Sequence, residues 1–302
     1  MFPSLSFLMM LKKEIILLKS TGKNWISTNN MIFIQLLLSR LSQAKNQTLY
    51  FFSLMMLRVE HLHRSVGNTA ILKDLHFELQ EGAVVGIVGP NGCGKTSLLN
   101  AINGYVSPQT GKITFYGQEI QNRSIEKRAK SGIGRVFQSF GIFKELTVFE
   151  NLALAYVHRL KWWQKLLPIS SFPNAYRQEI EAILEELELL QRKNDLAGNL
   201  SGGQMRLLEI ARLYLQDTKL YLLDEPTAGV APKLKGKVIS LLQKIIAQGK
   251  TVIIVEHDFE FLAQFVKEFY LMNSGKIVLQ GDYQTIKESP ITKEIYFGGQ
   301  KG

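Results

Sequence analysis

The architecture of this 302-residue chain follows from one stretch, Ala83-Val84-Val85-Gly86-Ile87-Val88-Gly89-Pro90-Asn91-Gly92-Cys93-Gly94-Lys95-Thr96. Its first half is apolar and β-branched, which is typical of a strand buried on both faces of a parallel sheet. Its second half is a glycine-rich loop that precedes a helical pattern, the arrangement known as a P-loop. The glycines permit a tight turn, and the backbone N–H groups of such a loop surround phosphate groups. The stretch therefore predicts an α/β fold with a phosphate site at the end of a buried strand.

The side chains of this loop indicate the chemistry of the phosphate site. Lys95 brings a positive charge to the outer phosphates of a nucleotide, and the Thr96 hydroxyl is a ligand for Mg²⁺. The residues from Gly89 to Thr96, together with Ser97, are the predicted nucleotide-binding residues. Cys93 lies just before a helix, and we expect the positive end of that helix to lower its pKa and make the thiol reactive.

The rest of the chain continues the α/β pattern. Two further apolar runs, Leu220–Leu223 and Thr251–Val255, resemble the first buried strand. Strands that alternate with helices predict a mostly parallel sheet covered on both sides. Residues 139–216 contain no comparable strand and are interpreted as a largely helical insertion. The predicted helices are Thr96–Asn103, Tyr176–Leu190, Met205–Leu215 and Lys233–Gln248.

Polar side chains follow the predicted strands. Asp224 and Glu225 end the second apolar run, and His257 follows the third; Gln138 comes after Gly134–Phe137. In open α/β sheets the ligand crevice lies at the carboxyl ends of the strands. Asp224 can hold Mg²⁺ there through water, and Glu225 can accept a proton from an attacking water. Solvated loop carboxylates and a surface histidine are the competing interpretation.

A second anion site is indicated at Leu200-Ser201-Gly202-Gly203-Gln204, which opens the apolar-periodic run from Met205 to Leu215. The first N–H groups of a helix are unpaired, the helix dipole is positive there, and glycine allows a phosphate to approach closely. A chain with one phosphate loop has no evident need for a second.

Composition limits the classes of function. The formal net charge is +10, and the one cysteine, Cys93, excludes an internal disulfide and fits a reducing compartment. No basic block with interleaved aromatic residues stands out after residue 57, which argues against a nucleic-acid partner. No apolar run reaches the length needed to span a bilayer. Any membrane contact is therefore expected to involve the surface of the protein.

The first residues differ from the remainder. Residues 1–57 carry six basic side chains against Glu14 alone and show no clean period. Residues 1–56 are interpreted as an extension of the domain, either disordered or a misassigned gene start with translation beginning at Met55 or Met56. A membrane-surface anchor built from Lys and bulky apolar residues is the alternative.

Five motifs in register make residues 57–302 resemble the ATP-binding cassette of ABC transporters. Gly89–Thr96 resembles the Walker A loop, Gln138 the Q-loop and Leu200–Gln204 the family signature; Leu220–Glu225 resembles Walker B, and His257 the switch histidine. The resemblance implies a P-loop NTPase core with a mostly parallel sheet. It also implies an N-terminal antiparallel β region and a helical signature subdomain at about 139–216.

The subtype is readable in the residues around these motifs. Gly132–Gln138, Leu146–Asn151, Val255–Asp258 and the tail from Gly275 to Gly298 are similar to the cassettes of branched-chain amino acid uptake systems and their urea-transport relatives. The resemblance implies import of branched-chain amino acids or a similar small polar solute. A lipopolysaccharide exporter, a soluble non-transport cassette and a regulator that binds nucleotide without hydrolysing it remain alternatives.

The resemblance also implies roles for the site residues. ATP and Mg²⁺ are the expected cofactors, with Thr96, Gln138 and Asp224 at the metal and Glu225 as the base. Lys95 and Ser201 would neutralise the γ-phosphate, while Gln138 and His257 would position water and metal. In such cassettes, Ser201, Gly202, Gly203 and Gln204 would bind ATP held by an opposing subunit. Val66 occupies the place where the family usually stacks an aromatic ring on adenine.

The expected partners follow from the same family. They are a second cassette, identical or different, integral membrane permease subunits and a solute-binding protein. A helical face centred on Ile142–Val157 is the expected contact with the permease. The expected location is peripheral, on the cytoplasmic face of the plasma (inner) membrane.

Overall fold

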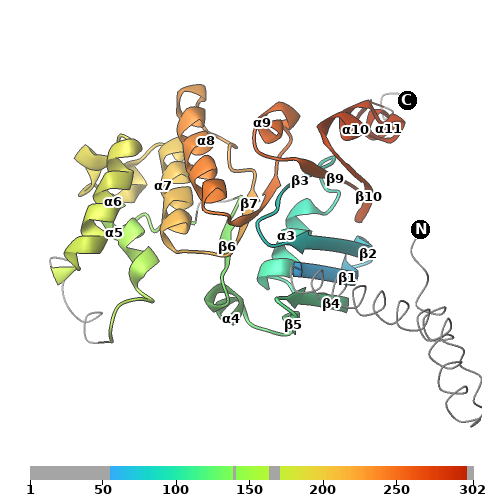
Figure 1. Ribbon diagram of the computed structural model, residues 1–302, viewed down its shortest axis with the longest axis horizontal. Coiled ribbons are helices and arrows are strands. Elements are labelled where there is room, and N and C mark those ends of the chain that lie inside the picture. The colour runs from blue at the N-terminus through green and yellow to red at the C-terminus, as the bar shows by residue number, and fades with distance from the viewer. Residues whose placement is uncertain (1–54, 139–140, 163–170, 298–302) are drawn as a thin grey trace, which may run out of the picture. The chain divides into compact units, whose positions relative to one another are not determined.

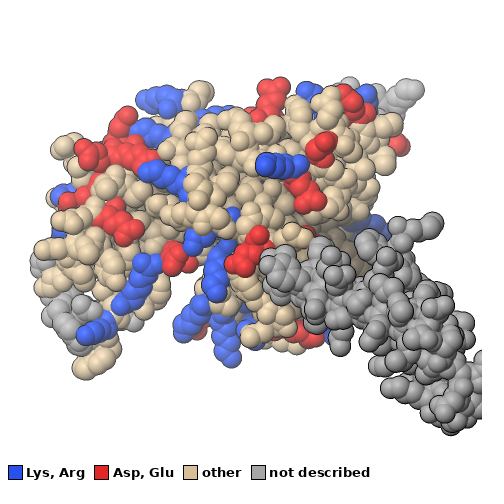
Figure 2. Space-filling model, viewed as in Figure 1, with Lys and Arg blue, Asp and Glu red and all other residues tan. Residues whose placement is uncertain are grey.

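The structure is a computed structural model that describes residues 55–138, 141–162 and 171–297 (Figure 1). The interpretation of residues 1–56 therefore lies outside the described residues, except for its last two methionines. On the face shown in Figure 2, the Lys and Arg side chains are interspersed with Asp and Glu. Among the described residues, no helix has both the length and the apolar character that crossing a bilayer requires.

An antiparallel sheet lies at the start of the described chain, as predicted. Its four strands have the order β2-β1-β4-β5. β1 begins at Met55, two residues before the predicted start of the cassette at Leu57, and Met56 is 1% exposed and packs in the core. Alternation of buried and exposed side chains gives the sheet one core face and one solvent face. The strand bounds are Met55–Val66 for β1, Thr69–Gln80 for β2, Thr110–Phe115 for β4 and Gln118–Glu119 for β5.

The second sheet is mostly parallel and has the order β10-β9-β3-β8-β7-β6. Every residue of β7 and β8 is buried, as their unbroken apolar runs predict. Burying each such Leu, Ile or Val side chain stabilises the fold by roughly 1.5–3 kcal/mol. Only β10 is antiparallel to its neighbour. The bounds are Val84–Val88 for β3, Ile133–Val136 for β6, Leu220–Asp224 for β7, Thr251–Val255 for β8, Glu268–Asn273 for β9 and Lys276–Gly281 for β10.

Helices connect these strands. The helix after the glycine-rich loop, α3, runs from Lys95 to Asn103 and ends at Gly104, whose φ is 89°. The helix predicted at Lys233–Gln248 is α8 (Pro232–Ala247), which begins and ends one residue earlier and has Pro232 in its first turn. The shorter helices are α4 (Ile125–Lys130), α9 (Phe259–Ala263), α10 (Tyr283–Glu288) and α11 (Pro290–Phe297).

The insertion predicted at residues 139–216 is helical where the structure describes it, apart from one isolated β-bridge between Thr147 and Leu196. Figure 1 shows α5 and α6 at one end of the described region, with α7 and α8 between them and the parallel sheet. The helix predicted at Tyr176–Leu190 ends early, because Glu188 has a φ of 57° that breaks helical geometry. The elements are α5 (Val148–Ala153), η1 (Leu154–Tyr156), α6 (Asn174–Glu186), η4 (Leu190–Arg192), η5 (Ala197–Asn199) and α7 (Gly202–Leu215).

Candidate active site

The loop after β3 depends on glycine at two close approaches. Gly89 and Gly94 have φ angles of 152° and 109°, which side chains disfavour. A Cβ atom at Gly89 would lie 2.1 Å from the Met272 carbonyl oxygen, and one at Gly94 would lie 2.8 Å from that of Ile71. A Cβ atom at Gly92 would meet no atom within 4 Å. The loop therefore packs against β9 and β2, whereas the space around Gly92 is open and can accept a phosphate.

The Lys95 ammonium group lies inside this loop. Its Nζ donates hydrogen bonds to the carbonyl oxygens of Gly89 at 2.7 Å and Pro90 at 2.9 Å. Lys95 is 6% exposed, so these bonds offset the cost of burying a charge. Beside it lies a cleft of about 560 Å³. Besides the loop, the cleft is lined by Ile71, Ser97, Gln138, Glu225 and His257.

Three predicted residues from separate elements meet in the cleft. His257 Nε2 lies 2.9 Å from Glu225 Oε1, and Gln138 Nε2 donates to Glu225 Oε2 at 3.4 Å. The Glu225 side chain is 20% exposed, so water reaches it. Its backbone φ is 48°, a conformation that costs energy for a non-glycine residue and is common at functional sites. The carboxylate is thus held from two sides beside the phosphate loop.

A second carboxylate lies deeper in the site. Asp224 is fully buried; its Oδ1 accepts a hydrogen bond from the Thr96 hydroxyl at 3.3 Å, and its Oδ2 lies 3.0 Å from Arg135 Nη2. Burial raises the pKa of Asp224, and the Arg135 charge opposes that shift. Thr96 and Asp224 together present a hydroxyl and a carboxylate oxygen side by side. Oxygen ligands of this kind fit Mg²⁺.

The backbone around Gln138 is clamped by α7. Arg206 Nη1 donates to the Phe137 carbonyl oxygen, and Arg206 Nη2 donates to that of Gln138 at 2.8 Å. Glu209 Oε1 accepts hydrogen bonds from the Phe137 and Gly141 backbone N–H groups, each at 3.2 Å. Arg206 and Glu209 also form a buried ion pair of 2.8 Å. The position of Gln138 is therefore coupled directly to α7.

The signature residues form the N-terminus of that same helix. Ser201 Oγ accepts a hydrogen bond from the Gln204 N–H at 3.3 Å, and the Gln204 side chain accepts one from the Ser201 N–H at 3.0 Å. This reciprocal pair is a capping box. Gly202 and Gly203 follow in the first turn of α7. No residue from Ser201 to Gln204 lines the cleft beside Lys95. The two predicted phosphate sites are thus distinct in this chain.

Comparison with known proteins identifies the family. The profile of the ABC transporter family matches residues 72–228. The chain is 32% identical to the probable branched-chain amino acid transport ATP-binding protein LivG of Archaeoglobus fulgidus, over 81% of this chain and 96% of the relative. It is 33% identical to the high-affinity branched-chain amino acid transport ATP-binding protein BraF of Pseudomonas aeruginosa, over 80% of this chain and 97% of the relative. The chain belongs to the ABC transporter family.

Solved structures of ABC cassettes share the fold described above. One is the crystal structure of a nucleotide-free ATP-binding cassette, with a TM-score of 0.68 and 31% identity over 81% of this chain and 99% of that chain. Another is a dimeric cassette in a post-hydrolysis state bound to ADP and Pi, with a TM-score of 0.66 and 26% identity over 76% and 99%. This ABC transporter subunit is accordingly an ATP-binding ATPase with the predicted α/β fold.

One expectation about the nucleotide site of this ABC subunit is wrong, and the structure adds an observation on Val66. Cys93 is 4% exposed, and burial raises the pKa of its thiol, so the expected low pKa is wrong. The positive end of α3 and the nearby Lys95 do not outweigh the loss of solvation. Val66, at the place usually held by an aromatic residue, is 63% exposed and does not line the cleft, whereas Ile71 does.

Arg135 is the site residue that sequence reasoning missed in this ABC subunit. Its side chain is 4% exposed; besides the ion pair with Asp224, it donates to Asn100 Oδ1 at 2.5 Å. Burial lowers the pKa of the guanidinium, and Asp224 opposes that shift. Arg135 lies within a stretch that signals the subtype, three residues before Gln138. Its contact with Asp224 is long-range, and no local pattern indicates it.

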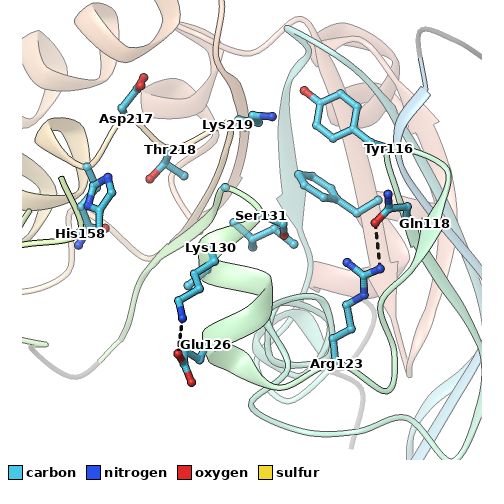
Figure 3. Close-up of a pocket in the computed structure, with 15 residues that line it drawn as sticks. Tyr116, Gln118, Arg123, Glu126, Lys130, Ser131, His158, Asp217, Thr218 and Lys219 are labelled. Carbon is cyan, nitrogen blue, oxygen red and sulfur yellow. Dashed lines mark hydrogen bonds and ion pairs between the residues drawn. The ribbon is translucent and has the colours of Figure 1, made fainter. Parts of the chain in front are cut away.

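A separate pocket of about 660 Å³ lies away from the phosphate loop of this ABC subunit (Figure 3). It is bordered by α4, the start of β6 and the turn between α7 and β7. Within it Lys130 donates to Glu126 at 2.6 Å, and Arg123 donates to Gln118 at 2.9 Å. None of the predicted site residues lines this pocket, so its volume does not mark the site of hydrolysis.

Proposed function

We propose that this ATPase subunit drives the import of branched-chain amino acids. The observation that carries the proposal is the similarity, over nearly their whole length, to ATP-binding proteins named for branched-chain amino acid transport in archaea and bacteria. Arginine is the second candidate substrate, because the arginine transport ATP-binding protein ArtM of Bacillus subtilis is 31% identical over 79% of this chain. Both candidates are imported polar solutes that the cassette itself need not touch.

In the proposed reaction a water molecule attacks the γ-phosphate of ATP. Glu225 accepts the proton of that water, as its position beside the phosphate loop and its partial exposure allow. His257 and Gln138, which hold the two oxygens of this carboxylate, orient the base and the water. Lys95 exchanges its hydrogen bonds with the loop carbonyls for contacts with the phosphates and stabilises their charge.

The proposed Mg²⁺ ligands are Thr96 and Asp224, directly or through water, with the side-chain oxygen of Gln138. When bound, Mg²⁺ neutralises charge on the phosphates. Asp224 Oδ1 faces Thr96 and Arg135 holds Oδ2, so the carboxylate is already oriented. The Arg135 charge also favours the ionised form that a metal ligand requires.

We further propose that hydrolysis takes place between two cassettes. The signature residues lie outside the cleft of their own chain, and a related cassette is dimeric with ADP and Pi bound. In this arrangement the N-terminus of α7 faces the γ-phosphate held by the partner. Ser201 contributes its hydroxyl, and Gly202 and Gly203 contribute backbone N–H groups.

The proposed membrane partners are separate permease subunits, together with a solute-binding protein, on the cytoplasmic face of the inner membrane. Apolar side chains on the helical insertion support a permease contact. Phe143 is 53% exposed, Trp162 is 76% exposed and Val157 is 38% exposed. Phe143 and Val157 lie within the expected contact face, Ile142–Val157, and Trp162 lies just beyond it. All three belong to the insertion that also contains α7.

We place the cassette at residues 57–302 and its helical subdomain at 139–216.

The substrate is tested with this subunit assembled with permease subunits and a solute-binding protein. The complex is reconstituted in liposomes and ATP hydrolysis is measured with leucine, arginine or no solute. We expect leucine to raise hydrolysis several-fold above the arginine and solute-free samples. Stimulation by arginine alone favours the second candidate, and no response to either contradicts amino acid import. A complex carrying Glu225→Gln is the control for contaminating ATPases.

A further inference from the structure

Three of the five histidines in the chain converge on one carboxylate, on the solvent face of the antiparallel sheet. Asp74 Oδ1 lies 2.8 Å from His61 Nδ1, 3.4 Å from His76 Nε2 and 3.8 Å from His63 Nε2. The rings of His61 and His76 meet edge to face, with centroids 4.3 Å apart. None of the four side chains belongs to the nucleotide site described above.

The strand pattern explains this convergence. Leu62 of β1 pairs with Leu75 of β2, and both are buried in the core. Side chains alternate between the faces of a strand, so the residues on either side of each leucine point to solvent. Those residues are His61 and His63 on β1, and Asp74 and His76 on β2. Two short motifs, His-x-His and Asp-x-His, therefore lie opposite each other.

The backbone adds to the convergence. The register of β1 shifts between Val59 and Leu62, and His61 and Asp74 have φ angles of 50° and 53°. Such bulges re-aim side chains and increase the local twist. The bulge is accommodated by Gly111 of β4, where a Cβ atom would lie 2.4 Å from the His61 carbonyl oxygen. The arrangement is thus built into three strands and does not depend on side-chain rotamers alone.

We propose that His61, Asp74 and His76, with His63 as a fourth ligand, bind one Zn²⁺ ion. One ligand atom from each of the first three residues already lies within 4.8 Å of the others. Zn²⁺ bonds of about 2.0–2.1 Å in a tetrahedron place ligand atoms roughly 3.3 Å apart. The four side chains are 46–72% exposed, so their rotamers can close that gap.

The ligand chemistry selects the class of metal. Imidazole nitrogens suit Zn²⁺ and related transition metals, whereas Mg²⁺ and Ca²⁺ require oxygen ligands. A surface cluster of hydrogen-bonded histidines without metal affinity is the competing explanation. A bound ion would connect side chains of β1 and β2. One of its ligands, Asp74, is three residues from Ile71, which lines the nucleotide cleft.

The test uses the full-length protein after chelator treatment, without nucleotide, because phosphates also bind metals. Co²⁺ is titrated as a coloured probe, followed by competition with Zn²⁺. We expect one saturable site with the visible absorption of a tetrahedral Co²⁺ centre, displaced by one equivalent of Zn²⁺. His61→Ala and His76→Ala should each weaken Co²⁺ and Zn²⁺ binding at least about tenfold. His158→Ala, which alters an exposed histidine outside the cluster, should leave binding unchanged.

A second readout separates binding from misfolding. Zn²⁺ should raise the Tm of the wild type and of His158→Ala but not that of His61→Ala, and the ATPase activity of His61→Ala should equal that of the wild type. Equal Zn²⁺ affinity in His61→Ala and His158→Ala would overturn the proposal. So would loss of binding in His257→Ala instead of His61→Ala, since that places the metal in the hydrolysis site. Absence of saturable Co²⁺ binding by the wild type also overturns it.

Discussion

Single residues in this site are held by contacts that are present before ATP binds. Lys95 donates to two carbonyl oxygens of its own loop, and Glu225 is shared between His257 and Gln138. Each of these contacts satisfies a group that would otherwise be costly to bury or to leave unpaired. When a nucleotide binds, Lys95 exchanges the loop carbonyls for phosphate oxygens without a change in its position. This preorganisation places the functional groups before the substrate arrives.

Glu225→Gln tests the assignment of the base. The amide keeps the size and shape of the side chain but cannot accept a proton from water. We expect ATP affinity within about threefold of the wild type and turnover reduced by roughly 10²–10⁴-fold, the usual contribution of a general base. Affinity is measured with a fluorescent ATP analogue, and turnover by phosphate release. Turnover close to the wild-type value would assign the base elsewhere.

Cys93 gives a pH prediction with a defined sign. Because burial raises its pKa, the native thiol retains its proton to higher pH than an ordinary cysteine does. Alkylation by iodoacetamide at pH 8 should be much slower in the native protein than in the unfolded chain. Above the unfolded-state pKa, the native state binds more protons, so the free energy of unfolding decreases as pH rises through the native value. Rapid native labelling at pH 7 contradicts this.

At the scale of elements, α7 connects the signature residues with Gln138. Its N-terminus carries Ser201, and within the next two to three turns Arg206 and Glu209 hold the backbone on both sides of Gln138. A rigid-body movement of this helix therefore moves the signature and the Q-loop together. The proposed permease contacts on the same helical insertion can affect the site by this route. Each link in this route is either a hydrogen bond or the helix α7 itself.

The Arg206–Glu209 pair predicts an asymmetry in stability. Both side chains are almost fully buried, at 1% and 2% exposure. Arg206→Met alone leaves a buried carboxylate without its ion-pair partner and should reduce the free energy of unfolding by about 3–5 kcal/mol. The double variant Arg206→Met/Glu209→Gln removes both charges but keeps a side-chain oxygen for the Phe137 and Gly141 N–H groups, and it should lose less than the single variant. Urea denaturation followed by circular dichroism measures both. A double variant less stable than Arg206→Met contradicts this explanation.

At the scale of the whole molecule, the strands that the sequence predicts are those with unbroken runs of apolar residues. The runs that became β3, β7 and β8 are unbroken because both faces of these strands are buried. The β1–β2 pairing was expected only through the family resemblance, since its bulges interrupt the alternation. Arg135 escaped detection because its partner Asp224 is 89 residues away. The low pKa expected for Cys93 failed because burial cannot be deduced from a helix N-terminus.

The proposed sharing of the active site between two cassettes predicts complementation between two inactive variants. Ser201→Ala damages the signature and Glu225→Gln damages the base, so neither should hydrolyse ATP alone. In a mixed dimer of the two, one site combines Glu225 of the first variant with Ser201 of the second and is intact. An equimolar mixture should recover roughly one quarter of wild-type activity, because random pairing makes about half of the dimers mixed, each with one intact site of two.

Phosphate release is measured at several mixing ratios of the two variants. Each variant alone, at the same total protein concentration, is the control. Ser201 also caps α7, and its loss costs about 1 kcal/mol of stability. Recovery in the mixture shows that this cost does not unfold the Ser201→Ala subunit, because an unfolded chain supplies no P-loop. If the signature served its own chain instead, every subunit in the mixture would stay defective. The activity would then remain at the level of the separate variants at every ratio.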